Sequence, residues 1–179
     1  MKILFHICCS NCALYPVKLS RSEGNEFTGL WYNPNIHPLE EYNLRLDSLK
    51  KLSDTLRIEV IYSEEYKPEE YFEAIKSPPP PDRCKSCYQL RLEKTAAKAK
   101  EEGFEAFSTT LLISPYQDFK QIETTGRHLA EKYNILFYMK DFRPYFREAQ
   151  HLAKELGLYR QKYCGCIFRR QERAKKQKE

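Results

Sequence analysis

The sequence predicts one α/β domain in which a five-stranded, mostly parallel β-sheet carries helices on both faces. Runs of strand length alternate five times with segments of helical period, which is typical of parallel strands joined by crossover helices. The chain has 179 residues, the usual size of one domain of roughly 100–200 residues. It contains no internal repeat and no linker-like stretch. We therefore expect a single domain over residues 1–179, with a basic C-terminal segment at 160–179.

The first third of the chain predicts three strands and two helices. The apolar run at 2–7 and the run EFTGLWY at 26–32 are typical of buried strands, and RIEVIY at 57–62 alternates as a third strand. Between the first two strands we expect a helix over 14–23, which the following Gly and Asn end. The apolar residues of 39–56 recur every three or four positions, which predicts a second helix.

The middle of the chain predicts two helices around a proline-rich turn, followed by a strand. A short helix at 69–76 is stopped by the four prolines of 78–81. The stretch 84–102 is rich in Leu, Ala, Lys and Glu, which are strong helix formers, and Gly103 ends it. The run FEAFST at 104–109 predicts the fourth strand.

The remaining elements are a helix at 119–133, a fifth strand at 135–139, a helix at 146–156 and a basic helix from Phe168 onward. Ligands of such folds bind beyond the carboxyl ends of the strands. We therefore expect the loops after the first and fourth strands, including the one that contains Tyr116, to face the same crevice.

Composition and charge exclude several classes of protein. Hydrophobic residues make up 41% and charged residues 31% of the chain, which is typical of a globular domain. No apolar stretch approaches the roughly 18 residues of a membrane span, and the start lacks the cleavage site of a signal peptide. We expect a cytoplasmic protein with no membrane partner.

The net charge of +5 comes from the C-terminal segment, because 160–179 contains eight Lys or Arg and two acids. Thirteen Tyr, ten Phe and this basic segment suit a nucleic-acid partner, since aromatic rings stack on unpaired bases and cations neutralise phosphates. A solvated charged helix is the alternative interpretation of the segment.

Seven cysteines are the strongest chemical signal in the sequence. They form three groups: Cys8, Cys9 and Cys12; Cys84 and Cys87; and Cys164 and Cys166. An odd number without an export signal argues against a disulfide framework and favours metal binding or redox chemistry. Thiolates from two segments complete either a structural zinc site or an iron–sulfur cluster that carries electrons, and spacing alone leaves both open.

The Cys164-Gly165-Cys166 motif predicts a different kind of chemistry. Two thiols separated by one residue can close a small disulfide ring, and the Gly removes the Cβ that would resist closure. Such a ring departs from relaxed disulfide geometry, and easily reduced disulfides are the regulatory or catalytic ones. We therefore interpret these cysteines as a redox pair. The alternative is that they are two further metal ligands.

Other polar residues near these motifs are weaker candidates. His6 lies in the first strand, where a hydrogen-bonded core residue is expected rather than a ligand. Asp82 directly precedes the CxxC motif, so it either caps the following helix or takes part in the site. The chain has six glycines, none of them in a phosphate-binding spacing, which argues against a nucleotide bound in the usual manner.

Four segments together resemble one known family over nearly the whole chain. HICCSNCALYPV, PDRCKSCYQLRL, STTLLISPYQD and GLYRQKYCGCIFR occur in the order found in the QueH family of cobalamin-independent epoxyqueuosine reductases. The resemblance implies an oxidoreductase that converts epoxyqueuosine to queuosine at the wobble position of tRNA. It also implies a fold akin to adenine nucleotide α-hydrolase-like (HUP-type) domains.

The resemblance further implies a cofactor, site residues and partners. The cofactor is a four-iron–four-sulfur cluster, and its expected ligands are Cys8, Cys9, Cys84 and Cys87. Cys164 and Cys166 are the expected redox pair, and an additional iron ion beside the cluster is bound partly by Asp82. The partners are the tRNA anticodon arm and an unidentified electron donor. A zinc-stabilised tRNA-binding module and a protein thiol–disulfide oxidoreductase remain as alternatives.

Overall fold

The computed structural model describes residues 1–63, 65–76 and 82–176. Its five-stranded sheet has the strand order β3-β2-β1-β4-β5, and every neighbouring pair is parallel. The strands are β1 (Lys2–His6), β2 (Glu26–Trp31), β3 (Glu59–Tyr62), β4 (Ala106–Thr109) and β5 (Leu136–Phe137). The order reverses direction at β1, so the loops that follow β1 and β4 meet at the switch point where such folds bind ligands.

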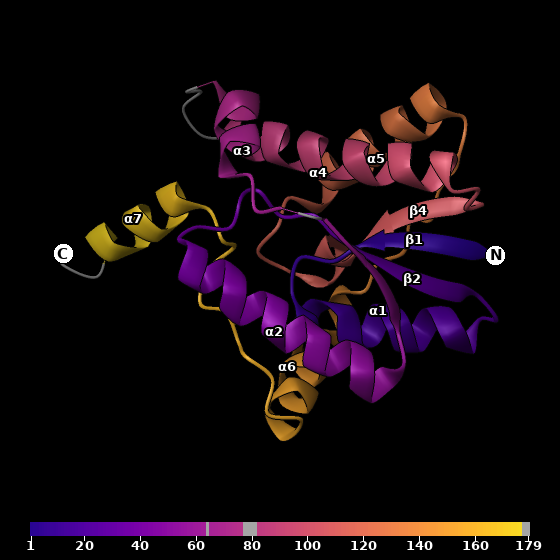
Figure 1. The fold of residues 1–179 in the computed structure, drawn as a ribbon, viewed down its shortest axis with the longest axis horizontal. Helices are drawn as coiled ribbons and strands as arrows, with labels where there is room; N and C mark the ends of the chain where they lie inside the picture. Colours follow the sequence, from indigo (N-terminus) through magenta and orange to yellow (C-terminus); the bar gives the residue numbers. More distant parts are fainter. Residues whose placement is uncertain (64, 77–81, 177–179) are drawn as a thin grey trace.

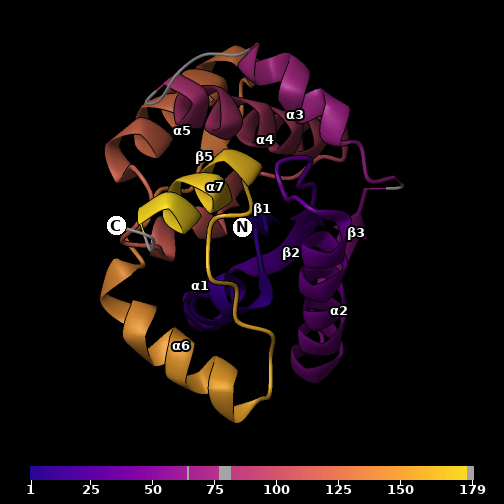
Figure 2. The same ribbon diagram turned by 90° about the vertical axis from the view of Figure 1, so that its left-hand side faces the viewer.

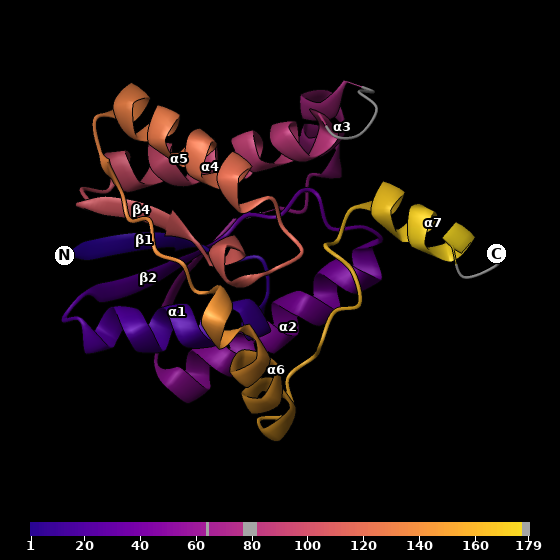
Figure 3. The same ribbon diagram turned by 180° about the vertical axis from the view of Figure 1, so that it is seen from behind.

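Helices cover both faces of the sheet, as the sequence predicts. One layer consists of α1 (Ser10–Ser22), α2 (Leu39–Leu56) and α6 (Phe146–Glu155), and the other of α3 (Pro68–Ile75), α4 (Asp82–Glu101) and α5 (Phe119–Tyr133) (Figures 1 and 3). Two 3₁₀ helices, η1 (Thr110–Ile113) and η2 (Arg143–Tyr145), follow β4 and β5, and α7 (Ile167–Lys176) ends the described chain. In Figure 1, α7 projects away from the two layers.

The core is built on the central strand β1. Ile3, Leu4 and Phe5 are fully buried, and the Phe5 ring stacks on Phe27 of β2 at 4.4 Å. A strand buried on both faces reads as a continuous apolar run, which explains why this segment does not alternate. The expected fold class is confirmed.

Several element boundaries differ from the sequence-based expectation: α3 (Pro68–Ile75), α4 (Asp82–Glu101) and α6 (Phe146–Glu155) are shifted by one or two residues, and β4 begins at Ala106 rather than at residue 104. Three further differences have a local explanation. α1 begins at Ser10 rather than at residue 14, because Cys9 caps the helix by accepting the N–H of Cys12. β3 begins at Glu59 rather than at residue 57, because Arg57 adopts a left-handed conformation that ends α2. β5 is confined to Leu136–Phe137 of the expected 135–139, at the edge of the sheet. The predicted proline turn at 78–81 lies outside the described residues.

Among the described residues, no helix has both the length and the apolar character needed to cross a membrane.

Candidate metal and redox site

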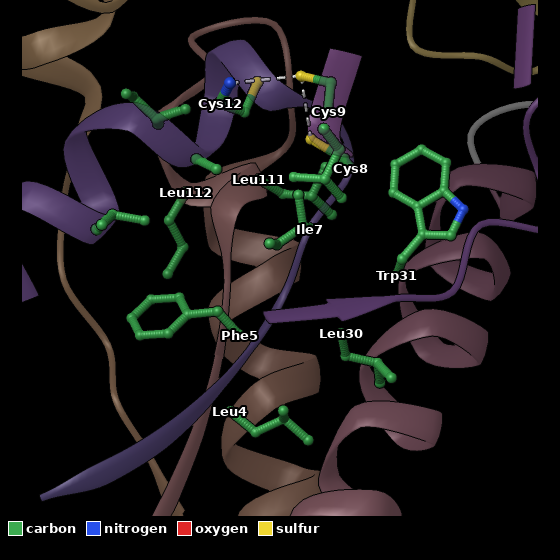
Figure 4. Close-up of a cluster of buried hydrophobic side chains, with 14 of the residues drawn as sticks. Leu4, Phe5, Ile7, Cys8, Cys9, Cys12, Leu30, Trp31, Leu111 and Leu112 are labelled. Atoms are coloured by element: carbon green, nitrogen blue, oxygen red, sulfur yellow. Dashed lines mark hydrogen bonds between the residues drawn. The ribbon is translucent and has the colours of Figure 1, made fainter. Parts of the chain in front are cut away.

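Three cysteine thiols meet where β1 ends and α1 begins. Cys8 and Cys9 follow β1, and Cys12 lies in the first turn of α1 (Figure 4). All three are buried, and their Sγ atoms lie within 4.8 Å of one another. Among the residues that the structure describes, this is the one group of three or more metal-ligating side chains at such spacing. Three buried soft ligands at this distance fit a soft metal ion or an iron–sulfur cluster.

The three thiols share their protons unequally. Hydrogen bonding with Cys12 and with Cys9 holds the pKa of Cys8 well below its usual value, despite burial. Burial raises the pKa of Cys9, and the hydrogen bond to Cys8 raises the pKa of Cys12. Among the three thiols, Cys8 therefore loses its proton most readily. A metal ion bound here displaces the remaining thiol protons, so its binding strengthens as pH rises.

Polar side chains from distant segments support this group. Thr110 of η1 accepts the N–H of Cys8 at 3.2 Å, and its hydroxyl lies 3.4 Å from the Cys8 Sγ. The Gln161 amide donates to the Cys9 Sγ at 2.8 Å. The segment that follows β4 and the C-terminal part of the chain therefore both hold these thiols in position.

His6 is a hydrogen-bonded core residue, as expected from the sequence. Its Nδ1 lies 3.0 Å from the Thr109 hydroxyl and its Nε2 lies 3.1 Å from the Asn33 side-chain oxygen. Burial lowers its pKa to about 3. Because both ring nitrogens already have partners, His6 is a structural residue that links β1 to Thr109 and Asn33 and is not available as a metal ligand.

The other four cysteines belong to α4 and to the segment before α7. Cys87 and Cys166 are buried in one small cluster with Tyr71 and Ile75, whereas Cys84 and Cys164 are exposed. The Tyr71 hydroxyl lies 3.0 Å from the Cys166 Sγ, within hydrogen-bonding distance. Burial raises the pKa of Cys87 to about 12. The CxxC motif and the CxC motif are thus brought to one place.

A buried arginine lies between the two groups of cysteines. Arg91 follows Cys87 by one helical turn and donates to its carbonyl oxygen at 3.1 Å. Burial opposes the charge on Arg91, but the thiolate forms of Cys87 and Cys8 favour it, and the pKa of Arg91 is raised. In return, its positive charge opposes the effect of burial on the thiols of Cys84, Cys87 and Cys164. One buried cation therefore acts electrostatically on both groups.

The segment 159–166, which we call the strap, crosses the site between α6 and α7 (Figure 2). Arg45 of α2 donates to the carbonyl oxygens of Tyr163 at 2.9 Å and Cys164 at 3.2 Å. The backbone N–H of His37 donates to the Gly165 carbonyl at 2.8 Å. Three successive carbonyls of the strap are therefore held by the loop after β2 and by α2.

Gly165 is required by this backbone path as well as by any ring closure between its neighbours. Its φ is +111°, and a Cβ there would lie 2.9 Å from Cγ1 and 3.3 Å from Cα of Ile36. Any side chain would push the strap away from the loop after β2. The sequence suggested only the redox reason for this glycine.

The two residues before the CxxC motif, Asp82 and Arg83, lie on different faces of α4. Asp82 is exposed and lines a surface hollow with Lys85 and Gln89 on another side of α4. Arg83 is buried, pairs with Glu172 of α7 at 2.6 Å and stacks over Phe168. The guanidinium of Arg83 thus docks the basic helix α7 on α4.

Sequence reasoning missed Arg45, Arg91 and Gln161. Arg91 had a usable signal, since it lies four residues after Cys87 and therefore on the same helix face. Arg45 also had one, because it shares the helical stripe of the buried residues Tyr42 and Leu49. Gln161 had none, since its contact with Cys9 joins residues far apart in the chain.

Comparisons with known proteins identify the family to which the chain is similar. The family model described as epoxyqueuosine reductase QueH matches residues 3–172. The epoxyqueuosine reductase QueH of Dehalococcoides mccartyi is 38% identical over 172 residues, which cover 96% of this chain and 94% of that protein. That of Thermotoga maritima is 39% identical over 186 residues, covering 99% and 94%.

A solved structure supports the fold alone. It is the crystal structure of a predicted subunit of tRNA methyltransferase from Methanocaldococcus jannaschii, with a TM-score of 0.52 and 15% identity. The match covers 87% of this chain and 76% of that chain. The family model and the two relatives are the stronger evidence, because their matches span nearly the whole chain, including the positions of all three cysteine motifs, and the relatives have a much higher sequence identity. The chain belongs to the QueH family, the epoxyqueuosine reductases.

Proposed function

We propose that this protein reduces epoxyqueuosine to queuosine at the wobble position of tRNA by means of an iron–sulfur cluster and a cysteine redox pair. Family membership supports the reaction. The observation that carries the proposal is the meeting of three buried thiols beyond β1, with the CxxC and CxC motifs grouped around Arg91 beside them. Cytoplasmic location follows from a tRNA substrate and remains part of the proposal.

A four-iron–four-sulfur cluster is proposed to bind through Cys8, Cys9, Cys84 and Cys87. Two of these thiols lie in the buried group beyond β1, and the other two lie on α4, whose Arg91 interacts with both groups. When bound, the cluster supplies electrons one at a time. Cys12 is the alternative ligand, because its thiol lies within 4.8 Å of those of Cys8 and Cys9.

Removal of the epoxide oxygen needs two electrons and two protons, since both C–O bonds break, an alkene forms and the oxygen leaves as water. Oxidation of the Cys164 and Cys166 thiols to a disulfide releases that number of electrons and protons. The exposed Cys164 is accessible to a substrate or reductant, while Tyr71 fixes the buried Cys166 sulfur. An external electron donor must then reduce the disulfide.

Asp82 is proposed to bind an additional iron ion beside the cluster. Its exposed carboxylate lies two residues before Cys84. The hollow that Asp82 lines is on a different face of α4 from Cys87 and Arg91. The role of Asp82 is therefore tested separately from the cluster ligands. Asp82→Asn should remove one iron per chain and leave sulfide unchanged. Loss of both iron and sulfide would instead make Asp82 part of the cluster site.

The tRNA anticodon arm is proposed to contact α7. The Arg83–Glu172 pair holds this helix against α4, close to the CxC motif. The exposed cations of α7 are Arg169, Arg170, Arg173 and Lys175. Cations on one exposed helix beside the site suit the phosphates of an RNA strand.

Single Ser variants test the proposed roles of the cysteines. Cys8→Ser, Cys9→Ser, Cys84→Ser and Cys87→Ser should each lose iron, sulfide and activity, because a hydroxyl is a poor ligand for a cluster. Cys12→Ser is the matched control, since it removes a thiol from the same buried group. Iron loss in Cys12→Ser together with wild-type iron in Cys84→Ser would replace Cys84 by Cys12 in the ligand set.

Cys164→Ser and Cys166→Ser should retain the cluster but lose turnover. Iron and sulfide analysis, thiol titration before and after one turnover, and mass spectrometry of the tRNA nucleosides measure these outcomes. Metal loss in step with activity would make these two cysteines ligands. A stoichiometric zinc protein that binds tRNA without reducing it would contradict the proposed function.

A further inference from the structure

Tyr116 is an aromatic side chain exposed at the rim of the site. It is 81% exposed, more than any other large hydrophobic residue that the structure describes. It lies in the loop 114–118, between η1 and α5, at the edge of the sheet where β1 and β4 end. The exposed ring face is open to a partner, and burying it on binding would gain the free energy of removing its apolar area from water.

The loop that carries Tyr116 is held in place by hydrogen bonds, and the ring contacts one neighbouring ring. Its N–H donates to the Ser114 hydroxyl at 3.3 Å, and the ring meets Phe146 edge-on, with centroids 5.7 Å apart at 82°. The Tyr88 hydroxyl donates to the Gln117 side chain at 2.8 Å and accepts the N–H of Asp118 at 3.1 Å. Because Tyr88 directly follows Cys87 in α4, these bonds tie the loop to the CxxC helix.

Further aromatic rings continue from Tyr116 towards the first cysteine group. Tyr145 stacks on Tyr15 at 5.2 Å and 16°, and Tyr15 lies one helical turn after Cys12. Figure 3 shows α5, α6 and the loops that precede them on one side of the molecule. The surface formed by Tyr15, Tyr116, Tyr145 and Phe146 is therefore connected to Cys12 along α1 and to the CxxC helix through Tyr88.

Cations accompany these rings. Lys18 lies over the Tyr15 ring at 5.3 Å, and Arg143 lies over Phe119 at 3.9 Å. Arg143 is paired with Asp141, and Glu148 accepts the Tyr15 hydroxyl, so Lys18 is the cation beside these rings for which the structure shows no acidic partner among the described residues. Aromatic rings interleaved with cations are typical of surfaces that bind single-stranded nucleic acid.

We infer that Tyr116 is a stacking platform for an unpaired nucleobase next to the wobble nucleotide of the tRNA anticodon loop. The inference rests on the proposed function. Chemistry on the wobble base requires that base to leave its stack and enter the crevice, so its neighbours lose a stacking partner. An exposed ring on an anchored loop at the rim supplies that partner, and a Tyr side chain has only two rotatable bonds to order on binding. It serves any base, since every base has a π face.

The test measures binding of an anticodon stem-loop RNA to the holoenzyme. The base beside the wobble position is replaced by a fluorescent adenine analogue whose emission reports stacking. Tyr116→Ala and Tyr116→Leu should weaken binding on the order of 10- to 100-fold, because base–aromatic stacking is worth roughly 1–3 kcal/mol per base. Tyr116→Phe keeps the ring and should bind like wild type. Tyr62→Ala is the control, because Tyr62 is also an exposed tyrosine but ends β3, the edge strand three positions away from β4 in the sheet.

The outcomes separate this inference from the proposed function. Wild-type affinity and an unchanged fluorescence response in Tyr116→Ala would overturn the stacking role, even if the wild type reduces its tRNA substrate. Slower reduction with unchanged RNA binding would also overturn it, and would assign Tyr116 to the electron donor. Equal losses in Tyr116→Leu and Tyr116→Phe would show that the hydroxyl, not the ring face, is used. A wild-type protein that neither binds nor reduces the RNA would contradict the proposed function itself.

Discussion

Replacing Arg45 by Met should loosen the strap and expose the CxC motif, because Arg45 binds two successive strap carbonyls. Its guanidinium donates to Tyr163 O and Cys164 O, and its Nε donates to the Glu41 carboxylate at 2.7 Å. Arg45 is 2% exposed and Glu41 8%. The substitution therefore removes two anchors from the strap and leaves a buried carboxylate without its cation.

The expected loss of stability follows from these contacts. Breaking a buried ion pair by removing one partner costs about 3–5 kcal/mol. The Tyr159 hydroxyl still donates to Glu41 at 2.6 Å, which places the expected loss near the lower end of that range. Since domains of this kind have about 5–15 kcal/mol of total stability, the variant should remain largely folded.

Denaturant unfolding and thiol reactivity separate the two effects of this substitution. Arg45→Met combined with Glu41→Gln removes the unpaired carboxylate, so it should recover about half of the lost stability. The strap still lacks the two hydrogen bonds from Arg45 in this double variant. Cys164 and Cys166 should therefore react faster with a thiol reagent in both variants than in the wild type. Wild-type thiol reactivity in the double variant would refute the view that Arg45 positions the CxC motif.

Three further predictions concern the tail, the core and pH. Deleting residues 173–179 should weaken tRNA binding and flatten its salt dependence, because contacts between cations and phosphates release counterions. Unchanged binding across a salt series would show that the basic C-terminal segment is a solvated helix. Gly126→Ala should destabilise the fold by about 1–3 kcal/mol in denaturant unfolding, since the new Cβ would lie 2.3 Å from the Phe137 ring; wild-type stability would contradict this packing. Burial lowers the pKa of His37 to about 4, so the unfolded state binds this proton first, and His37 lowers stability by at most about 1.4 kcal/mol per pH unit as pH drops from about 6.5 towards 4. His6, whose pKa burial lowers to about 3, adds its own loss in the same direction. His37→Phe should reduce the total loss in unfolding experiments at matched metal content, and an identical pH profile would exclude a contribution from His37.

Local patterns were sufficient to predict the sheet and its helices. The apolar run of β1, the helical period of 39–56 and the break at Gly103 each depend on residues that are close in sequence. Parallel strands end at one edge of the sheet, so the position of the Cys8 loop beside the loop after β4 followed from the alternation of elements. The contact between Thr110 and Cys8 confirms it.

The details of the site depend on contacts between distant residues, which a single sequence does not contain. Cys12 joins Cys8 and Cys9 only because α1 begins at Ser10, and a cysteine cap is a weak signal for a helix start. The strap is held by Arg45, more than a hundred residues earlier in the chain. Its path also gives Gly165 a backbone role that local chemistry did not indicate.

The most direct test of the central claim is anaerobic purification followed by iron, sulfide and zinc analysis and a single-turnover assay on tRNA that carries epoxyqueuosine. The proposal predicts iron and sulfide at the stoichiometry of a four-iron–four-sulfur cluster, visible absorption, and conversion of epoxyqueuosine to queuosine with loss of two free thiols when no external donor is present. Stoichiometric zinc without iron, with the epoxide intact after incubation with a reductant, would contradict it.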